Sequence, residues 1–199
     1  MEIDRILLHL SEMLLARGDD IAEFVEHADA VQRQRYYSEV IELSTNRTTV
    51  LFALGKEVMA TLLKKTLKDL DEPEALIERF GTPNFILVAQ EPLSSGNNTA
   101  MQVRDKRLQA HGGMFQVFLT KELAYNPSKH ELVPRHEKLA EDEAREIMER
   151  YLIKNRTKMP IISRTDIMAR WLGLRQGDIV RITRYNDTSG EYYYYRCCL

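Results

Sequence analysis

The stretch MPIISRTDIMARWLGLRQGDIVRITRYNDTSGEYYYYR, residues 159–196, decides the fold of the C-terminal part of the chain. It begins as an extended segment, and a compact helix is expected to follow over 165–174. Residues 178–184 and 191–196 are rich in β-branched and aromatic side chains, which favour strands. The segment YNDTSG between them consists of turn-forming residues, so the pattern predicts a β-hairpin.

Two helices accompany this hairpin. The compact helix has Thr165 or Asp166 as its N-cap, and Gly173 ends it. Upstream, residues 141–153 form an amphipathic pattern with acidic residues in the first turn, where they interact favourably with the helix dipole. Together these segments predict a small C-terminal domain with one sheet and two helices.

The first part of the chain alternates helical and strand-like segments, which is the pattern of a small α/β layer. The expected helices cover 3–17, 19–31 and 56–70, with a short one inside 94–113. The expected strands cover 36–43, 49–55, 84–90 and 114–119. The pattern changes near Tyr125. We therefore expect a two-domain protein of mixed α+β and α/β class, with an N-terminal α/β domain over 1–126 that holds a small mixed sheet, and a C-terminal domain over 127–199.

The charge is small overall but unevenly distributed. The formal net charge is −2 and the sequence pI is near 6.2, which argues against a general binder of polyanions. Residues 1–126 hold 14 Lys and Arg against 19 Asp and Glu, whereas residues 127–199 hold 14 against 11. The basic residues of the second part are concentrated in 151–184, which suits an acidic protein partner. The alternative is an independent nucleic-acid-binding module that uses this basic stretch.

No pattern of residues supports an enzyme. The phosphate-binding motifs GxGxxG and GxxxxGK[ST], the nucleophile motif GxSxG and the zinc motifs CxxC and HExxH are all absent from the sequence. The Asp-x-Lys and Glu-x-Lys tripeptides of many metal-dependent nucleases are absent too. His130 and His136 have no third ligand near them in sequence, so we interpret them as hydrogen-bonded surface or junction residues. We expect no catalytic site, no metal site and no cofactor.

The tail GEYYYYRCCL contains four consecutive tyrosines and the only two cysteines. Cys197 and Cys198 are adjacent, which would strain a disulfide between them, so we assign them no chemistry and expect serine substitutions to do little. The cysteine usage is typical of a soluble protein of a reducing compartment. Because residues in a strand alternate between faces, only two of the four tyrosines could share a base-stacking platform. We therefore interpret the tyrosines as residues of the core and of a subunit interface.

Several motifs in fixed order make residues 127–199 resemble the C-terminal assembly domain of the fifth-largest subunit shared by the nuclear RNA polymerases. The archaeal polymerase H subunit corresponds to that domain alone. The residues that match the family's motif are His130, Pro134, His136, Arg150, Tyr151, Pro160, Asp166, Ala169, Arg170, Trp171, Gly173, Gly177, Val180, Ile182, Arg184, Thr188, Gly190, Tyr192, Tyr195 and Arg196. The region upstream resembles the eukaryotic jaw domain more weakly, mostly in the order of its elements.

The resemblance implies a noncatalytic subunit of a multisubunit DNA-dependent RNA polymerase that acts in transcription. By the family's pattern, the C-terminal domain docks on the largest subunit, which also holds the magnesium-binding aspartates, and the N-terminal domain forms part of the lower jaw near downstream DNA. The implied partners are the largest subunit and the rest of the polymerase, with DNA contacted only weakly and within the complex. Neither a membrane nor a homo-oligomer is implied. The implied location is the nucleus for a cellular protein, and a host cytoplasmic factory and the virion for a viral one.

Three residues depart from the family's pattern. Ile167 stands where a proline usually follows the helix-opening aspartate, and Met159 replaces the leucine of a leucine-proline step. Ala140 stands where Ser or Thr commonly caps the first helix of the domain. These departures indicate a divergent lineage, with a protist and a large DNA virus as the alternatives.

Overall fold

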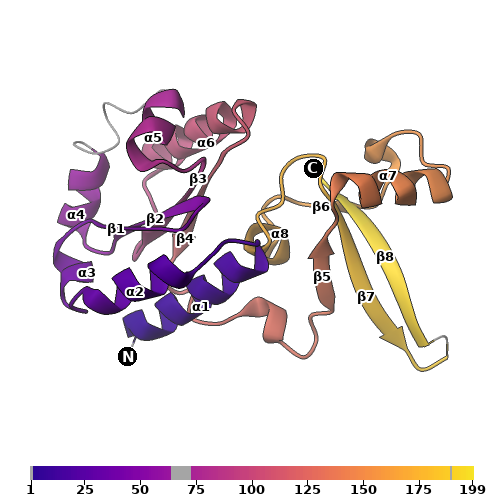
Figure 1. The fold of residues 1–199 in the computed structure, drawn as a ribbon, viewed down its shortest axis with the longest axis horizontal. Helices are drawn as coiled ribbons and strands as arrows, with labels where there is room; N and C mark the ends of the chain where they lie inside the picture. Colours follow the sequence, from indigo (N-terminus) through magenta and orange to yellow (C-terminus); the bar gives the residue numbers. More distant parts are fainter. Residues whose placement is uncertain (1, 64–72, 189) are drawn as a thin grey trace. The chain divides into compact units, whose positions relative to one another are not determined.

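The computed structural model describes residues 2–63, 73–188 and 190–199. The chain forms two compact units, residues 1–125 and residues 126–199, which Figure 1 shows as a ribbon. Each unit contains helices and its own four-stranded sheet. The mixed helix-and-strand content with two sheets is thus confirmed, and the division lies one residue before the expected boundary.

The first unit is built around a mixed sheet. Its elements are α1 (Glu2–Ala16), α2 (Ala22–Ala30), α3 (Arg35–Ser38), β1 (Ile41–Ser44), β2 (Thr48–Ala53), α4 (Lys56–Thr61), α5 (Pro73–Phe80), β3 (Asn84–Ala89), α6 (Ser95–Ala110) and β4 (Met114–Leu119). The strand order is β1-β2-β3-β4. The β1–β2 pair is antiparallel, whereas β2, β3 and β4 run parallel to one another.

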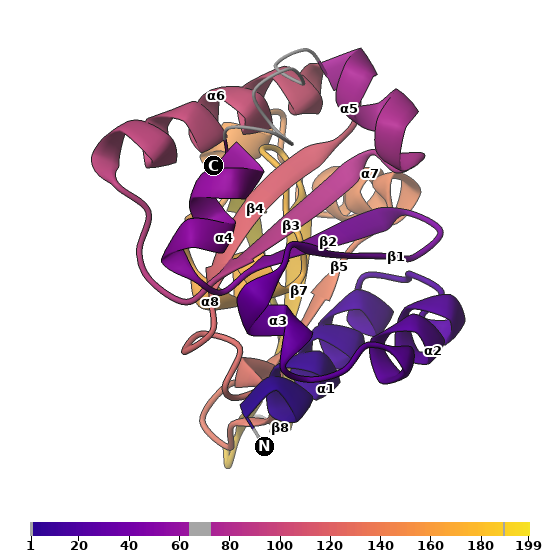
Figure 2. The same ribbon diagram turned by 90° about the vertical axis from the view of Figure 1, so that its left-hand side faces the viewer.

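Helices cover both faces of this sheet. Figure 2 shows α5 and α6 on one side and α1 and α2 on the other. All six residues of β3 are buried, and Leu87 belongs to the same apolar cluster as Met101 and Leu108 of α6. On the opposite face the rings of Tyr36 and Phe52 meet edge-on, with 5.0 Å between their centroids. The almost wholly apolar sequence of β3 therefore reflects burial on both faces.

Three segments of the first unit differ from the expected elements. The strand expected over 36–43 is wrong in its first half, because residues there form α3. This short helix places the Tyr36 ring in the core, where its hydroxyl donates to the Ala28 carbonyl at 3.4 Å. The helix α6 has 16 residues instead of being short, and α5 was not expected. Of the helix expected over 56–70, α4 forms the beginning, and residues 64–70 lie outside the described residues.

The second unit is built around the expected hairpin. Its elements are η2 (Pro127–Lys129), β5 (Arg135–Lys138), α7 (Glu141–Arg150), η3 (Arg156–Lys158), β6 (Ile161–Ile162), α8 (Ile167–Trp171), β7 (Ile179–Asn186) and β8 (Gly190–Cys198). The strand order is β5-β7-β8-β6, so the hairpin strands β7 and β8 are the two inner strands. Both are longer than expected, and the two cysteines belong to β8.

The ends of the two helices follow from local chemistry. Of the two residues proposed as the cap of α8, Asp166 is the N-cap, and its carboxylate accepts from the Met168 and Ala169 N–H groups at 2.8 and 3.4 Å. Gly173, after the end of α8, has φ +62°, a conformation that favours glycine. Ala140 provides no side-chain cap for α7, but the Glu143 carboxylate accepts from the Ala140 N–H at 3.3 Å.

The inner strands join two small cores. Cys197 and Ile179 belong to a cluster with Ala144 and Ile147 of α7. Cys198 and Val180 belong to a second cluster with Ala169 of α8, on the opposite face of the sheet. One strand end thus supplies both cores. In the described part of the chain, no helix has the length and apolar character that a membrane crossing needs.

Candidate functional surface: the β7–β8 hairpin

The hairpin has two faces with different neighbours. Because paired residues in an antiparallel ladder share a face, the α7 face comprises Ile179, Arg181, Thr183, Tyr193, Tyr195 and Cys197. The α8 face comprises Val180, Ile182, Arg184, Tyr192, Tyr194 and Arg196. The helices cover only the end of the hairpin near the cysteines, and Figure 1 shows β7 and β8 extending well past α7 to their turn. The other end of the hairpin is therefore a surface of the second unit.

The α7 face carries balanced charges. The Arg181 guanidinium donates to the Glu137 carboxylate at 2.8 Å, and this hydrogen bond lowers the pKa of Glu137 and raises the pKa of Arg181. The same guanidinium lies 5.5 Å from the centre of the Tyr193 ring. The Tyr195 ring lies 5.8 Å from the Tyr151 ring, and burial is the main cause that raises the pKa of Tyr195. This face is a packed mixture of rings and paired charges.

The α8 face carries positive charge without an acidic partner. The guanidinium of Arg184 lies 4.8 Å from the centre of the Tyr194 ring, and that of Arg196 lies 5.5 Å from it. Arg196 also donates to the Ile161 carbonyl at 3.3 Å, and its Nε is buried without a hydrogen-bond partner. Among the described residues neither arginine forms an ion pair. Since both cations stack on one ring, this face suits a carboxylate from a partner.

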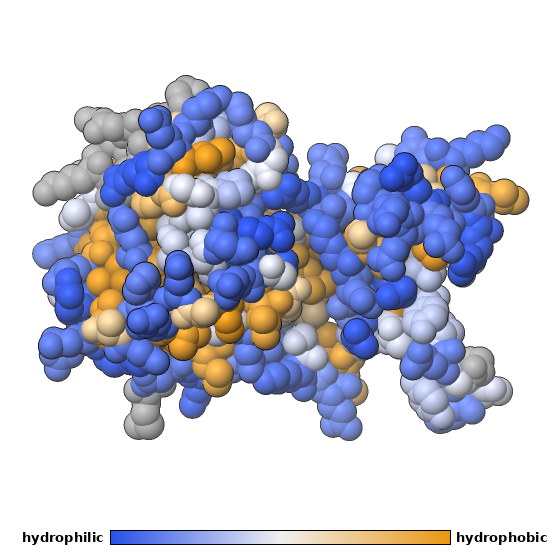
Figure 3. All heavy atoms as spheres, in the orientation of Figure 1, coloured by the Kyte–Doolittle hydropathy of each residue, from blue (hydrophilic) through white to orange (hydrophobic). Residues whose placement is uncertain are grey.

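The expectation that the tyrosines belong to the core holds only in part, because Tyr195 packs against the cluster that contains Ile147 and Tyr194 packs against the cluster that contains Ala169. Tyr192 and Tyr193 are 39% and 52% exposed, and Tyr194 and Tyr195 are half-buried. The exposure of Tyr192 and Tyr193 follows from the length of the hairpin, because both residues lie beyond the part of the sheet that the helices cover. In Figure 3 this end of the hairpin has hydrophilic to intermediate colours and no orange patch. A role of these tyrosines in a subunit interface remains a prediction.

About half of the residues singled out from the sequence hold the domain together. Ala169, Trp171, Val180 and Ile182 are buried, and Gly177 and Gly190 have φ +92° and +70°. The Pro160 carbonyl accepts from the Cys197 N–H at 2.8 Å, and Thr188 N–H donates to Asn186 Oδ1 at 3.0 Å within the turn. Pro160, Asp166 and Thr188 are exposed as well, and the remaining exposed or half-buried positions are His130, Pro134, His136, Arg150, Tyr151, Arg170, Arg184, Tyr192, Tyr195 and Arg196. The second group is the one that can contact a partner.

The two histidines have local hydrogen-bond partners. His130 Nδ1 accepts from the Leu132 N–H at 3.2 Å, and His136 Nδ1 lies 2.7 Å from the Pro134 carbonyl oxygen. Within the described ranges, no three His, Cys, Asp or Glu side chains lie together as metal ligands would. His130 therefore lies in the junction before β5, whereas His136 lies within β5, opposite Ile182.

Three of the arginines in the basic stretch 151–184 do not share one unpaired surface. Arg156 pairs with Glu141, and Arg181 pairs with Glu137 on the α7 face. Arg184, only three residues further on, lies on the opposite face of the hairpin. A nucleic-acid platform would need these cations on a common side.

The two thiols are inert in this setting. Both Cys197 and Cys198 are completely buried, and burial raises the pKa of each, that of Cys198 to about 11. Only the thiolate is reactive, so these side chains act as small apolar core residues. A serine at either position would place a hydroxyl in a core, which costs on the order of 1–3 kcal/mol when it is not hydrogen-bonded. The burial of both thiols therefore changes the expectation from the sequence: each serine variant should destabilise the second unit.

We expect thiol labelling of the native chain to be at least about 100-fold slower than labelling of the urea-unfolded chain at the same mildly alkaline pH. The thiolate fraction falls when the pKa rises, and burial blocks the reagent in addition. The measurement is the rate of alkylation of each cysteine by mass spectrometry. Equal rates in the native and the unfolded chain would show that the C-terminal end of β8 is not packed as described.

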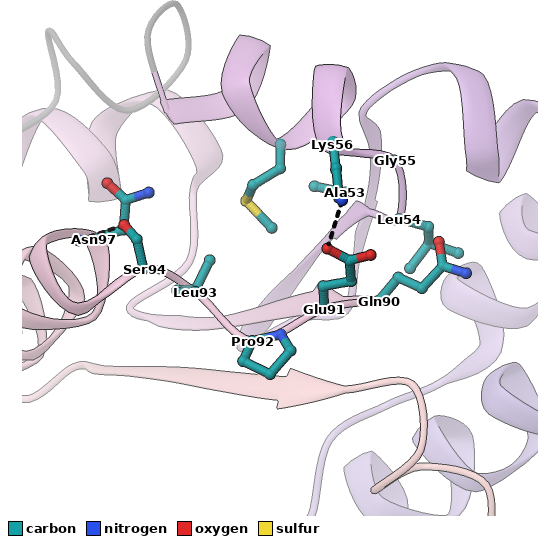
Figure 4. A pocket seen from close by; sticks show the side chains of 11 residues that line it. Ala53, Leu54, Gly55, Lys56, Gln90, Glu91, Pro92, Leu93, Ser94 and Asn97 are labelled. Carbon is teal, nitrogen blue, oxygen red and sulfur yellow. Dashed lines mark hydrogen bonds and ion pairs between the residues drawn. The ribbon is translucent and has the colours of Figure 1, made fainter.

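The first unit contains a cavity of about 160 Å³ at the carboxyl ends of β2 and β3, shown in Figure 4. Lys56 and Glu91 form an ion pair across it at 3.3 Å, and both side chains are exposed. Ser94 caps α6 by accepting from the Asn97 N–H at 3.4 Å. Lys56, Glu91 and Ser94 are thus already engaged with other groups. The β7–β8 hairpin is the better candidate for a functional surface.

Comparisons with known proteins agree with the features of the second unit. Residues 125–198 match the family described as RNA polymerase Rpb5, C-terminal domain. Two similar proteins are DNA-directed RNA polymerases I, II, and III subunit RPABC1 of Caenorhabditis briggsae and of Caenorhabditis elegans, each 41% identical over 83 residues. The matched region is 42% of this chain and 39% of each relative, so the chain spans about two fifths of the length of these relatives. The resemblance stated from the sequence motifs is confirmed for the C-terminal domain.

Proposed function

We propose, from the premise that residues 125–198 are a divergent Rpb5 C-terminal domain, that this chain is a noncatalytic subunit of a multisubunit DNA-directed RNA polymerase. The single observation that carries the proposal is the family match over the whole second unit, together with 41% identity to subunits of that name. The chemistry of the described residues supports it, since the thiols are buried and the histidines have local partners.

The second unit is the part that docks, and its partner is the largest polymerase subunit. The support is the division among its residues: one set fixes the fold, and another set is exposed or half-buried, with Arg184, Tyr192, Tyr195 and Arg196 on the hairpin. Exposed tyrosines and unpaired arginines are typical of protein interfaces, where both residue types are enriched. RNA synthesis and its magnesium-binding aspartates belong to the largest subunit.

The first unit acts as part of the lower jaw near downstream DNA. Its net charge of −5, from 14 basic and 19 acidic residues in 1–126, favours a contribution of shape over direct binding of phosphates. DNA is then contacted only weakly and within the complex. For a cellular protein this work takes place in the nucleus, and for a viral one in a cytoplasmic factory.

The test is affinity purification of the tagged full-length chain from the cells that express it, followed by mass spectrometry. We expect the two largest polymerase subunits among the captured proteins. A tagged chain that ends at Tyr125 is the control, and it should capture neither subunit. Capture of nucleic acid without polymerase subunits would favour the independent nucleic-acid-binding module instead.

A further inference from the structure

We propose that the outer edge of β8 is a docking edge, to which an extended segment of another polypeptide adds as a fifth strand. The outward backbone groups of Glu191, Tyr193 and Tyr195 lie there, near the guanidinium of Arg196. The inference rests on the proposed function, because the segment belongs to another subunit of the polymerase. The inference adds how the two polypeptides contact each other, namely by strand pairing, which the family match does not specify.

The outer edge of β8 is unpaired over most of its length. β8 pairs with β7 on one side over nearly its whole length, from Gly190 to Cys197. On its other side it pairs only with β6, and only at Cys197 and Cys198. In the part of the chain that the structure describes, no strand lies against the outer edge of residues 190–196.

The direction of the free backbone groups follows from the paired end of the strand. The Cys197 N–H points outward, since it donates to the Pro160 carbonyl at 2.8 Å, and the Cys198 N–H points toward β7, since it donates to the Asp178 carbonyl at 2.8 Å. The groups of successive residues alternate between the two sides of a strand. The N–H and C=O of Glu191, Tyr193 and Tyr195 therefore point outward, ready to pair with an added strand.

This edge has few of the features by which a solitary edge strand avoids association, since its only charged side chains are Glu191 and Arg196 at its two ends. Its sequence, Glu191 to Arg196, contains neither Lys nor Pro. The register with β7 runs one-to-one from Asn186↔Gly190 to Ile179↔Cys197, without a bulge. The free stretch is about 17–20 Å long, which is the length of an ordinary strand. An exposed edge of this kind is prone to aggregation when it is left unpaired. When a strand of a partner pairs with it, the edge is a binding site.

The side chains that border the edge indicate the chemistry of the partner. Tyr194 and Arg196 border it on the α8 face, where no described carboxylate pairs with Arg196. Tyr193 and Tyr195 border it on the α7 face and offer rings to a residue opposite them. Aromatic rings pair favourably with aromatic or β-branched residues across strands. The partner segment is therefore extended, with an acidic residue on one side and β-branched or aromatic residues on the other.

The test compares Tyr193→Pro with Tyr193→Ala in the tagged full-length chain. Both variants lose the ring, but only proline removes the outward N–H and adds bulk at the edge. The amount of largest polymerase subunit captured per chain should be about tenfold lower for Tyr193→Pro than for Tyr193→Ala, as for the loss of one edge hydrogen bond or more. Hydrogen exchange should find the β7 amides equally protected in the two variants, because the Tyr193 N–H does not bond to β7.

The pair Glu191→Pro and Glu191→Ala repeats the comparison next to the turn, in case proline at 193 unfolds the hairpin. Equal capture by the proline and alanine variants, with wild-type capture intact, would overturn edge pairing and leave the proposed function standing. Absence of capture by the wild type would overturn both. A wild-type homodimer that only the proline variants dissociate, with capture unchanged, would identify a second copy of the chain as the occupant and refute the proposal.

Discussion

A chain that ends at Gly190 is expected to lose the fold of residues 126–190, while residues 1–125 keep theirs. The deletion removes the inner strand β8 and with it the ladder to β7 and the pairing of β6. It also removes Cys197 from one core and Cys198 from the other. We expect the free energy lost with an inner strand to exceed the free energy of unfolding of a whole domain, which is roughly 5–15 kcal/mol.

Hydrogen exchange with mass spectrometry reads the two units separately. We expect amides of β7 and α7 to exchange at unfolded rates in the truncated chain, and amides of β3 to remain protected. The control is a chain that ends at Cys198, which retains β8 and should protect β7. Protection of β7 in the chain that ends at Gly190 would mean that β8 is not the strand that organises this sheet.

Trp171→Ala is expected to lower the free energy of unfolding of the second unit by about 3–5 kcal/mol. Trp171 is 2% exposed at the end of α8, and truncation of a large buried aromatic side chain leaves a cavity. A domain this small has only a few large buried side chains, and most of its stability depends on them. We therefore expect the variant to populate the unfolded second unit and to assemble poorly.

Ile167→Ala on the same helix is the matched control. Ile167 is 40% exposed, so its substitution should change the unfolding free energy by no more than about 0.5 kcal/mol. Urea titration followed by far-UV circular dichroism suits both variants, because Trp171 is the only tryptophan and its removal abolishes the indole signal. Similar midpoints for the two variants would contradict the packing described for α8.

The parts of the fold that could be predicted are those in which local sequence and burial agree. The β-hairpin combines strand-forming residues with a turn segment, and β3 is apolar throughout because both its faces are covered. The cap at Asp166 follows from the affinity of a short carboxylate for free N–H groups. The burial of Trp171 and Val180 could be predicted because their side chains are apolar.

Other features depend on tertiary contacts that a sequence pattern does not contain. Tyr36 and its neighbours have strand-like side chains, yet burial of the ring against Phe52 selects a helix. The helix α6 was underestimated because only Met101 and Leu108 are buried along it, which leaves almost no apolar periodicity. The exposure of Tyr192 and Tyr193 depends on how far the strands continue past α7 and α8. No local pattern determines that distance.

The subunit composition of the polymerase itself shows most directly whether this chain is one of its subunits. The enzyme is purified through a tag on its largest subunit from cells that express this chain, washed with high salt, and analysed by quantitative mass spectrometry. We predict this chain in amounts equimolar with the largest subunit. A pure and active polymerase that lacks this chain would contradict the account.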